Sequence, residues 1–363
     1  MSAVTDPTYR RCEELWTPDG DIVIQSGSDD DSTRVLYRMH RASLGEAPVL
    51  TDMVASALRC SHTPESLRNL LDESCLDLPL LTLAYSVDET TVFLQALHDQ
   101  TSFPPPPGPS LPPESSPLPP ITHILAVLRL STVYDVTRLR RIAIAHLDTF
   151  FPTSFPTLSK TLRALSSGLK IDTFPGPARH STVPVSDLIS RAYEARVPWI
   201  IPYSTYLYTL SATMSRLTSD IILSSYISAP DRSACLIAFA HKFTHLARMT
   251  LHLQRYPLHD VDTHTCAGEA DWEVLRAVFV EGADALADCV LHTLRYTDML
   301  WLLIDAAAPG IRACDACVKA VGEESEAARR GYWDELPVVL GLPPWDELEK
   351  MREAELGVTE QPM

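Results

Sequence analysis

Two short segments near the start of the chain have the apolar pattern of β-strands. Asp21–Gln25 reads DIVIQ, and Val35–Met39 alternates apolar and polar side chains. The polar and acidic stretch Ser28–Ser32 separates them. Strand-length segments joined by such a stretch are typical of a β-hairpin. The pattern therefore predicts an antiparallel strand pair with a wide loop.

Segments with the apolar spacing of helices come next along the chain. Apolar residues recur every three or four positions over Leu44–Leu58, which predicts one or two short helices, the second opened by Pro48. Thr63-Pro64 begins a further helical pattern. Leu80–Ala84 is an apolar run of strand length, and Ser86–Glu89 is a capping box that opens the next helix. Strands and helices are thus interspersed in this part of the chain.

A proline-rich insert then interrupts the pattern. Ten of the 20 residues from Thr101 to Pro120 are proline. Neither a helix nor a sheet accommodates that composition, so we expect an extended, partly polyproline loop. Helical periodicity resumes at Ile121–Thr132 and Val136–Phe150. These two segments predict a closing helical hairpin.

Composition divides the rest of the chain. Prolines and glycines predict a linker, with one short helix around Leu158–Leu165. Helical periodicity follows, and the tail from Glu347 to Met363 is charged at first and is then expected to lack regular structure. The predicted organisation is an N-terminal segment (1–18), a first domain (19–151) with the proline-rich insert (101–120), a linker (152–185), a helical domain (186–346) and a charged tail (347–363).

Charge and hydropathy restrict the partners. The chain has 363 residues and a net charge of −17, and its lysines and arginines are scattered, which argues against nucleic acid. The small basic group Arg138, Arg140 and Arg141 lies in a helical pattern and is interpreted as a solvated face. No signal-peptide core or transmembrane-length apolar stretch is present. We therefore expect an intracellular protein, nuclear or cytoplasmic, with no membrane contact and with reduced cysteines.

Histidines His241 and His245 are four residues apart and could share a zinc ion on one helix face. A zinc peptidase, however, needs a glutamate directly after the first histidine, and Lys242 stands there. The pair is therefore interpreted as a half-buried helix face, with a structural metal as the alternative.

A second set, Cys289, His292, Cys314 and Cys317, would complete a Cys₃His zinc site. Both pairs lie in helical patterns, where residues three apart also share a core-facing stripe, and cysteine packs well as a small apolar residue. We favour the core interpretation, so no metal and no cofactor is predicted. The four residues remain candidate ligands.

The sequence contains no pattern of an activated nucleophile or a phosphate loop. Gly-x-Ser-x-Gly, Walker and Gly-x-Gly-x-x-Gly motifs are all absent from it. We predict no catalytic residue and no enzymatic activity. Trp333–Pro337 and Leu342–Trp345 place tryptophans beside prolines. Such a segment either docks on another protein or, as we favour, packs back on its own domain.

The order of the first segments resembles the opening of a BTB/POZ domain. Asp21–Ile24 (DIVI) is followed by Val35–Leu44 (VLYRMHRASL) and by Pro48–Met53 (PVLTDM). Leu80–Ala84 and the helix after it resemble the third strand and the next helix of that family. Residues 121–150 resemble its closing helical hairpin.

A broader likeness spans nearly the whole chain. Leu15–Asp21 (LWTPDGD) and Trp333–Trp345 are similar to the opening and closing segments of BTB proteins from mushroom-forming fungi. The resemblance implies an α+β BTB/POZ fold, a short sheet with helical hairpins, followed by a mostly α-helical C-terminal domain.

BTB domains are self-association and adaptor modules, and their dimer forms through the first helix and the N-terminal segment. The resemblance therefore implies a non-enzymatic protein–protein interaction protein, a homodimer or adaptor with other protein partners, a cullin scaffold among them. The helical domain would bind a client. The apolar residues of the first helices are the expected interface: Leu44, Leu50, Met53, Val54, Ala57 and Leu58.

An alternative from another class stays open. The C-terminal helical domain could be an enzyme or a zinc-dependent module that the BTB domain only dimerises. A metal ion in the purified protein, or a deep polar pocket with converging histidines and carboxylates, would favour it.

Overall fold

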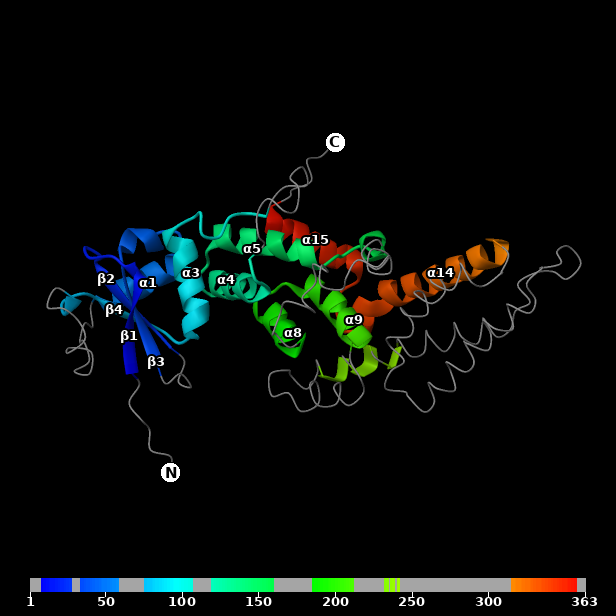
Figure 1. Ribbon diagram of the computed structural model, residues 1–363, viewed down its shortest axis with the longest axis horizontal. Helices are drawn as coiled ribbons and strands as arrows, with labels where there is room; N and C mark the ends of the chain where they lie inside the picture. Colours follow the sequence, from blue (N-terminus) through cyan, green and yellow to red (C-terminus); the bar gives the residue numbers. More distant parts are fainter. Residues whose placement is uncertain are drawn as a thin grey trace, which may run out of the picture. The chain divides into compact units, whose positions relative to one another are not determined.

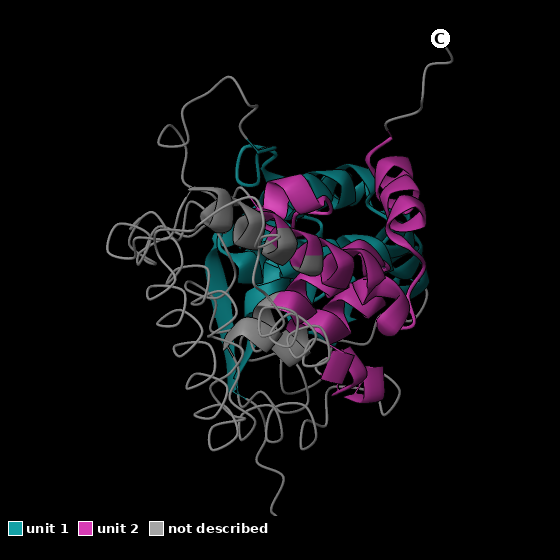
Figure 2. Cartoon of the chain, turned by 90° about the vertical axis from the view of Figure 1, so that its right-hand side faces the viewer, with its two compact units in different colours: residues 1–149 teal, residues 150–363 magenta. Residues whose placement is uncertain are grey.

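The computed structural model describes residues 8–27, 33–58, 75–106, 119–159, 185–211 and 315–357, together with 232–234, 236–238, 240 and 241. The chain forms two compact units, residues 1–149 and 150–363, shown in teal and magenta in Figure 2. The boundary between them lies two residues before position 151, the predicted end of the first domain. Unit 1 is mixed α/β, and the described part of unit 2 is helical.

Unit 1 contains a four-stranded sheet of order β1-β3-β2-β4 (Figure 1). β2 (Ile22–Ser26) and β3 (Thr33–Met39) pair antiparallel, so the predicted hairpin is confirmed. The predicted third strand, β4 (Leu80–Leu83), pairs parallel with β2. The sequence pattern did not predict β1 (Thr8–Trp16), which pairs parallel with β3.

The described helices of unit 1 pack with this sheet around one core. Ser86 caps α3 (Val87–His98) as the sequence predicts, since its Oγ accepts a hydrogen bond of 3.3 Å from the Glu89 backbone N–H. In the core, the Tyr37 hydroxyl lies 2.7 Å from Thr91 Oγ1 and 3.0 Å from Ser26 Oγ. The helical elements are η1 (Arg41–Leu44), α1 (Pro48–Ala57), α3 (Val87–His98), α4 (Ile121–Val133) and α5 (Thr137–Phe150).

The predicted closing hairpin is formed by α4 and α5. Tyr134 lies at the turn between them, is buried, and stacks on Phe93 of α3 at a ring distance of 5.7 Å. Asp135 follows with a φ of 57°, a left-handed conformation that lets the chain reverse direction. Through Tyr134, the turn of the hairpin thus packs against α3.

The two ends of the proline-rich insert are held by unit 1, while residues 107–118 lie outside the described part. Phe103, which we expected within the loose insert, is 3% exposed and lies 5.2 Å from the His146 ring of α5. The Pro104 carbonyl lies 2.8 Å from His146 Nε2. At the other end, Pro120 precedes α4 directly and is its N-cap. The packed domain therefore extends farther into the insert than the prolines suggested.

Unit 2 contains the helices α8 (Val185–Glu194), α9 (Ile201–Ser211), α14 (Asp315–Val339) and α15 (Trp345–Leu356), with a 3₁₀ turn, η4 (Pro198–Ile200). α15 covers the charged first part of the predicted tail, residues 347–356, so helical structure extends beyond the predicted end of the helical domain at residue 346. Gly357, with φ of 73°, ends this helix.

An aromatic cluster ties the end of α14 to α9 and α15. Trp333 is 1% exposed and stacks on Trp345 at a ring distance of 4.5 Å. The Trp345 indole N–H donates to the Trp333 carbonyl at 2.8 Å. Tyr203 and Tyr206 of α9 approach Trp333 edge-on at 6.4 and 6.0 Å. The tryptophan segment therefore packs on its own unit.

Candidate interaction surface on helix α1

The six residues expected at a dimer interface divide into two groups. Leu44, Leu50 and Val54 are buried in the core of unit 1. Met53 and Ala57 are half-buried, and Leu58 is 47% exposed. Only the second group can contact another molecule while the unit stays folded. The expectation is corrected accordingly: half of the apolar stripe lies inside the chain.

Val49 belongs to the exposed group, with 38% of its surface accessible. Because α1 begins at Pro48, Leu50 and Val54 lie on one face at i, i+4 spacing, and Val49, Met53 and Ala57 lie on the next. This spacing is readable in the sequence once the first residue of the helix is known. We define the α1 surface as Val49, Met53 and Ala57, together with Leu58, the exposed C-cap residue that follows the last turn of the helix.

Few charged residues lie on α1 beside the α1 surface. Asp52 is the one ionisable residue between Pro48 and Leu58. The hydroxyls of Thr51 and Ser56 donate back to the carbonyls of Ala47 and Asp52, at 3.1 and 3.0 Å. These bonds satisfy the polar side chains within the helix. The exposed side of α1 is therefore poorer in charge than expected for a chain in which 21% of the residues are charged.

A polar network fixes the start of α1. Glu46 accepts a hydrogen bond of 2.7 Å from the Arg138 guanidinium of α5 and one of 3.1 Å from the Gln100 amide. Arg138 also donates to the Ala96 carbonyl of α3 at 3.4 Å. One arginine of the predicted solvated face thus connects three elements of unit 1. The start of α1 is therefore tied to α3 and α5 by side-chain hydrogen bonds.

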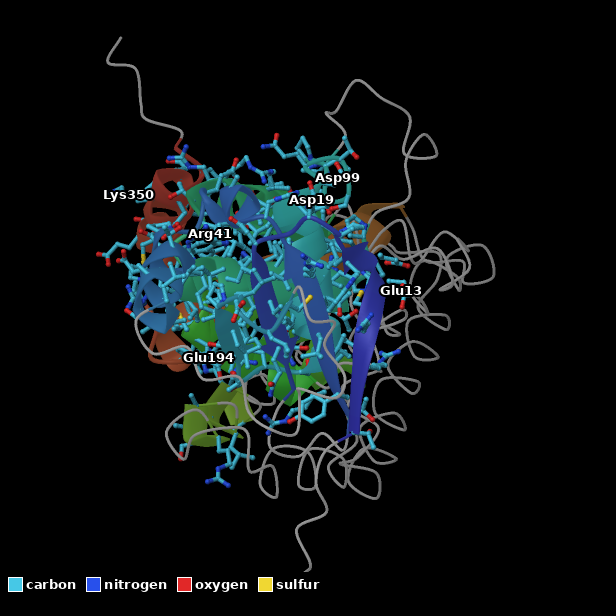
Figure 3. The ribbon with its side chains drawn as sticks, turned by 90° about the vertical axis from the view of Figure 1, so that its left-hand side faces the viewer. Glu13, Asp19, Arg41, Asp99, Glu194 and Lys350 are labelled. Atoms are coloured by element: carbon cyan, nitrogen blue, oxygen red, sulfur yellow. The ribbon has the colours of Figure 1, made fainter. Side chains whose placement is uncertain are left out.

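Charged residues of the segments that resemble a BTB/POZ domain lie at the turn that leads into η1. Asp21 accepts hydrogen bonds from the Arg41 backbone N–H at 2.6 Å and from its Nε at 2.8 Å. Desolvation raises the pKa of Asp21, but these hydrogen bonds and the guanidinium charge outweigh it, so the pKa lies below its ordinary value. Asp19 lies 3.4 Å from His40. These side chains, of which Figure 3 labels Asp19 and Arg41, hold the turn in place and lie at the surface of the unit.

The candidate zinc ligands are not brought together by described residues. Cys289, His292 and Cys314 lie outside the described part of the chain, as does the side chain of Cys317. His241 is described, and its Nε2 lies 2.8 Å from a Glu335 carboxylate oxygen of α14, whereas His245 is not described. Among the described residues, no three histidines, cysteines or carboxylates form a group that could hold a metal ion.

Compared with protein-family models, with curated proteins and with solved structures, the chain matches none. Within the part that the structure describes, no helix has the length and apolar character needed to cross a membrane. The geometry of the α1 surface and the aromatic packing of unit 2 are therefore the observations from which a function can be argued.

Proposed function

We propose that this chain is a non-enzymatic protein–protein interaction protein whose first unit is a BTB/POZ domain that self-associates through the α1 surface. The order of elements in unit 1 supports the proposal: an antiparallel hairpin, a short helix pair, a parallel third strand, a helix and a closing hairpin. The helical second unit then binds a client protein inside the cell.

The observation that carries the proposal is the exposed, charge-poor face of α1. Val49, Met53 and Leu58 are apolar side chains that folding of the unit leaves accessible. Grouped apolar exposure on a rigid element is typical of a partner surface. In a two-fold dimer the same helix is used twice, so the α1 surface of one chain would face the α1 surface of the other.

Charged substitutions on the two faces of α1 test the proposal. Val49→Asp combined with Met53→Asp places carboxylates in the proposed contact. Because burying an unpaired carboxylate costs roughly 3 kcal/mol, we expect dimerisation to weaken about a hundredfold or more while the circular dichroism spectrum is unchanged. Measurement by sedimentation velocity would show the loss of the dimer directly.

Two control variants make the result specific. Val133→Asp introduces the same change at an exposed position on α4, where 45% of the valine surface is accessible, and should leave the association unchanged. Leu50→Asp, one residue from Val49 but with a side chain in the core, should unfold the unit. Dimerisation unaffected by the Val49 and Met53 changes would show that α1 is not the contact.

A further inference from the structure

The proline-rich insert has no part in the proposed function, although its first residues are described and leave the packed unit soon after α3. The side chain of Phe103 is buried, whereas Pro104 and Pro105 are exposed and Pro106 is half-buried. We define these four residues as the insert stem. Its prolines are accessible to another molecule while unit 1 stays folded.

The backbone of the insert stem is restricted by its sequence. A proline fixes its own φ near about −65° and disfavours the α conformation for the residue before it. Because Pro107 is the next residue in the sequence, every residue of the stem precedes a proline. The stem is therefore confined to extended backbone of the polyproline II type. Its prolines have no N–H, so their backbone can only accept hydrogen bonds.

Contacts with unit 1 hold the start of the stem in place. Asp99, labelled in Figure 3, accepts hydrogen bonds of 2.8 Å from the backbone N–H and the hydroxyl of Thr101. Phe103 then packs on the His146 ring, and the Pro104 carbonyl accepts a hydrogen bond of 2.8 Å from His146 Nε2. A segment that is already ordered loses less conformational entropy when a partner binds it. These anchors therefore favour binding at the prolines of the stem.

Polyproline II segments are recognised by protein grooves lined with aromatic side chains, because the preformed helix presents its proline rings at little entropic cost. We propose that the insert stem is a docking site for a partner protein with such a groove, whose aromatic rings pack against Pro104, Pro105 and Pro106. The partner contacts these prolines and not Phe103, since the Phe103 ring is already buried in unit 1.

The charge around the stem specifies the kind of groove. Residues 69–128 contain no lysine and no arginine. Arg138, which shares the Glu46 carboxylate with Gln100, is paired with that carboxylate. A groove that adds carboxylates beside its aromatic rings needs a cation next to the prolines of its ligand, and the sequence on either side of the stem supplies none. The stem therefore suits an aromatic groove without an acidic pocket.

The stem belongs to the connection between α3 and α4 and includes no residue of the α1 surface. The inference therefore does not rest on the proposed self-association. The full-length variant with Val49→Asp and Met53→Asp should bind the partner groove as the wild type does, so a failure of one proposal is distinguishable from a failure of the other.

Titration of an isotope-labelled domain tests the docking. The probe is a WW domain of the kind that binds uninterrupted proline runs, followed by NMR while the unlabelled full-length chain is added. We expect the resonances of its groove residues to shift or broaden. An SH3 domain with an acidic pocket beside its aromatic groove should bind about tenfold more weakly or not at all. Absence of WW binding at about 0.5 mM chain, or tighter binding by the SH3 domain, would overturn the inference.

Substitutions then locate the binding in the stem. Pro105→Ala combined with Pro106→Ala removes two accessible rings and keeps the anchors, so we expect an unchanged thermal midpoint and WW binding weakened about tenfold or more. Pro18→Ala changes an exposed proline outside the insert and should bind as the wild type does. Replacing residues 108–118 with a Gly-Ser linker should keep the affinity within about threefold. Wild-type affinity in the double variant, or loss of binding in the linker variant, would show that the stem is not the docking site.

Discussion

His146 shows how one residue couples the proline-rich insert to the core. Its imidazole is 1% exposed, and since a carbonyl can only accept, Nε2 must carry the proton given to Pro104. Nδ1 then has no hydrogen in the neutral form, and it has no hydrogen-bond partner. Protonation would place an N–H there without an acceptor. Burial lowers the pKa of His146, and the bond to Pro104 offsets this only in part.

The sign of the resulting pH dependence follows from this pKa. Because the pKa is lower in the folded chain than the ordinary 6.5, the unfolded chain takes up the proton first as the pH falls. The stability contributed by neutral His146 is therefore present above pH 6.5 and is lost as the pH drops toward the folded pKa. We expect urea unfolding midpoints to fall more between pH 7.5 and 5.5 for the wild type than for His146→Gln. Equal slopes would contradict this.

At the scale of elements, the stem of the insert and its middle should behave differently. Phe103→Ala removes a buried ring and should cost about 3 kcal/mol of unfolding free energy. Replacing residues 107–118 with a Gly-Ser linker of equal length should change the thermal midpoint little, because loop composition beyond the packed stem affects stability weakly. Calorimetry on both variants checks the boundary, and a large loss from the linker exchange would show that the middle packs as well.

The last helix provides a second test at this scale. A chain ending at Gly357 should be as stable as the full chain, since the charged helix α15 is kept. A chain ending at Pro344 loses Trp345, exposes the face of Trp333, and should lose about 3 kcal/mol or more. Thermal unfolding followed by tryptophan fluorescence compares the two. Equal midpoints would mean that α15 does not stabilise unit 2.

The elements that the sequence predicts correctly are those whose local pattern agrees with their surroundings. β2 is a β-branched run that is buried along its whole length, and α3 begins at a capping box whose hydrogen bond forms. The closing helices carry apolar residues every third or fourth position and bury them. In each case, one local signal was sufficient to predict the element, because the residues that give the signal also make the contacts that stabilise the element in the fold.

The elements that the sequence did not predict lack such a local signal. β1 carries four consecutive or nearly consecutive charges and is joined to β3 mainly through its backbone, so its sequence lacks strand alternation. α15 buries Leu348 fully and packs Trp345 on Trp333, while most of its other residues are charged. The interface residues were assigned to one stripe, although Leu50 and Val54 form one row on α1 and Val49 and Met53 form the adjacent row, and packing of α1 on the rest of the unit decides which row points inward. Such information comes from tertiary contacts.

The whole molecule consists of two units, and the proposed contact with a second copy of the chain lies on the α1 surface of unit 1. The α1 surface is apolar, so its contact should persist at high salt. A contact made by charged pairs would instead weaken as salt screens them. The salt dependence of association therefore distinguishes an apolar contact from a charged one without a substitution.

Self-association of the first unit is the central claim, and sedimentation velocity of the full-length wild type tests it most directly. The measurement should cover protein concentrations from about 0.5 to 50 µM, a range in which a specific dimer of ordinary affinity populates. We predict a species of twice the chain mass of 40.2 kDa that persists at high salt. A single species of one chain mass at the highest concentration would contradict the account.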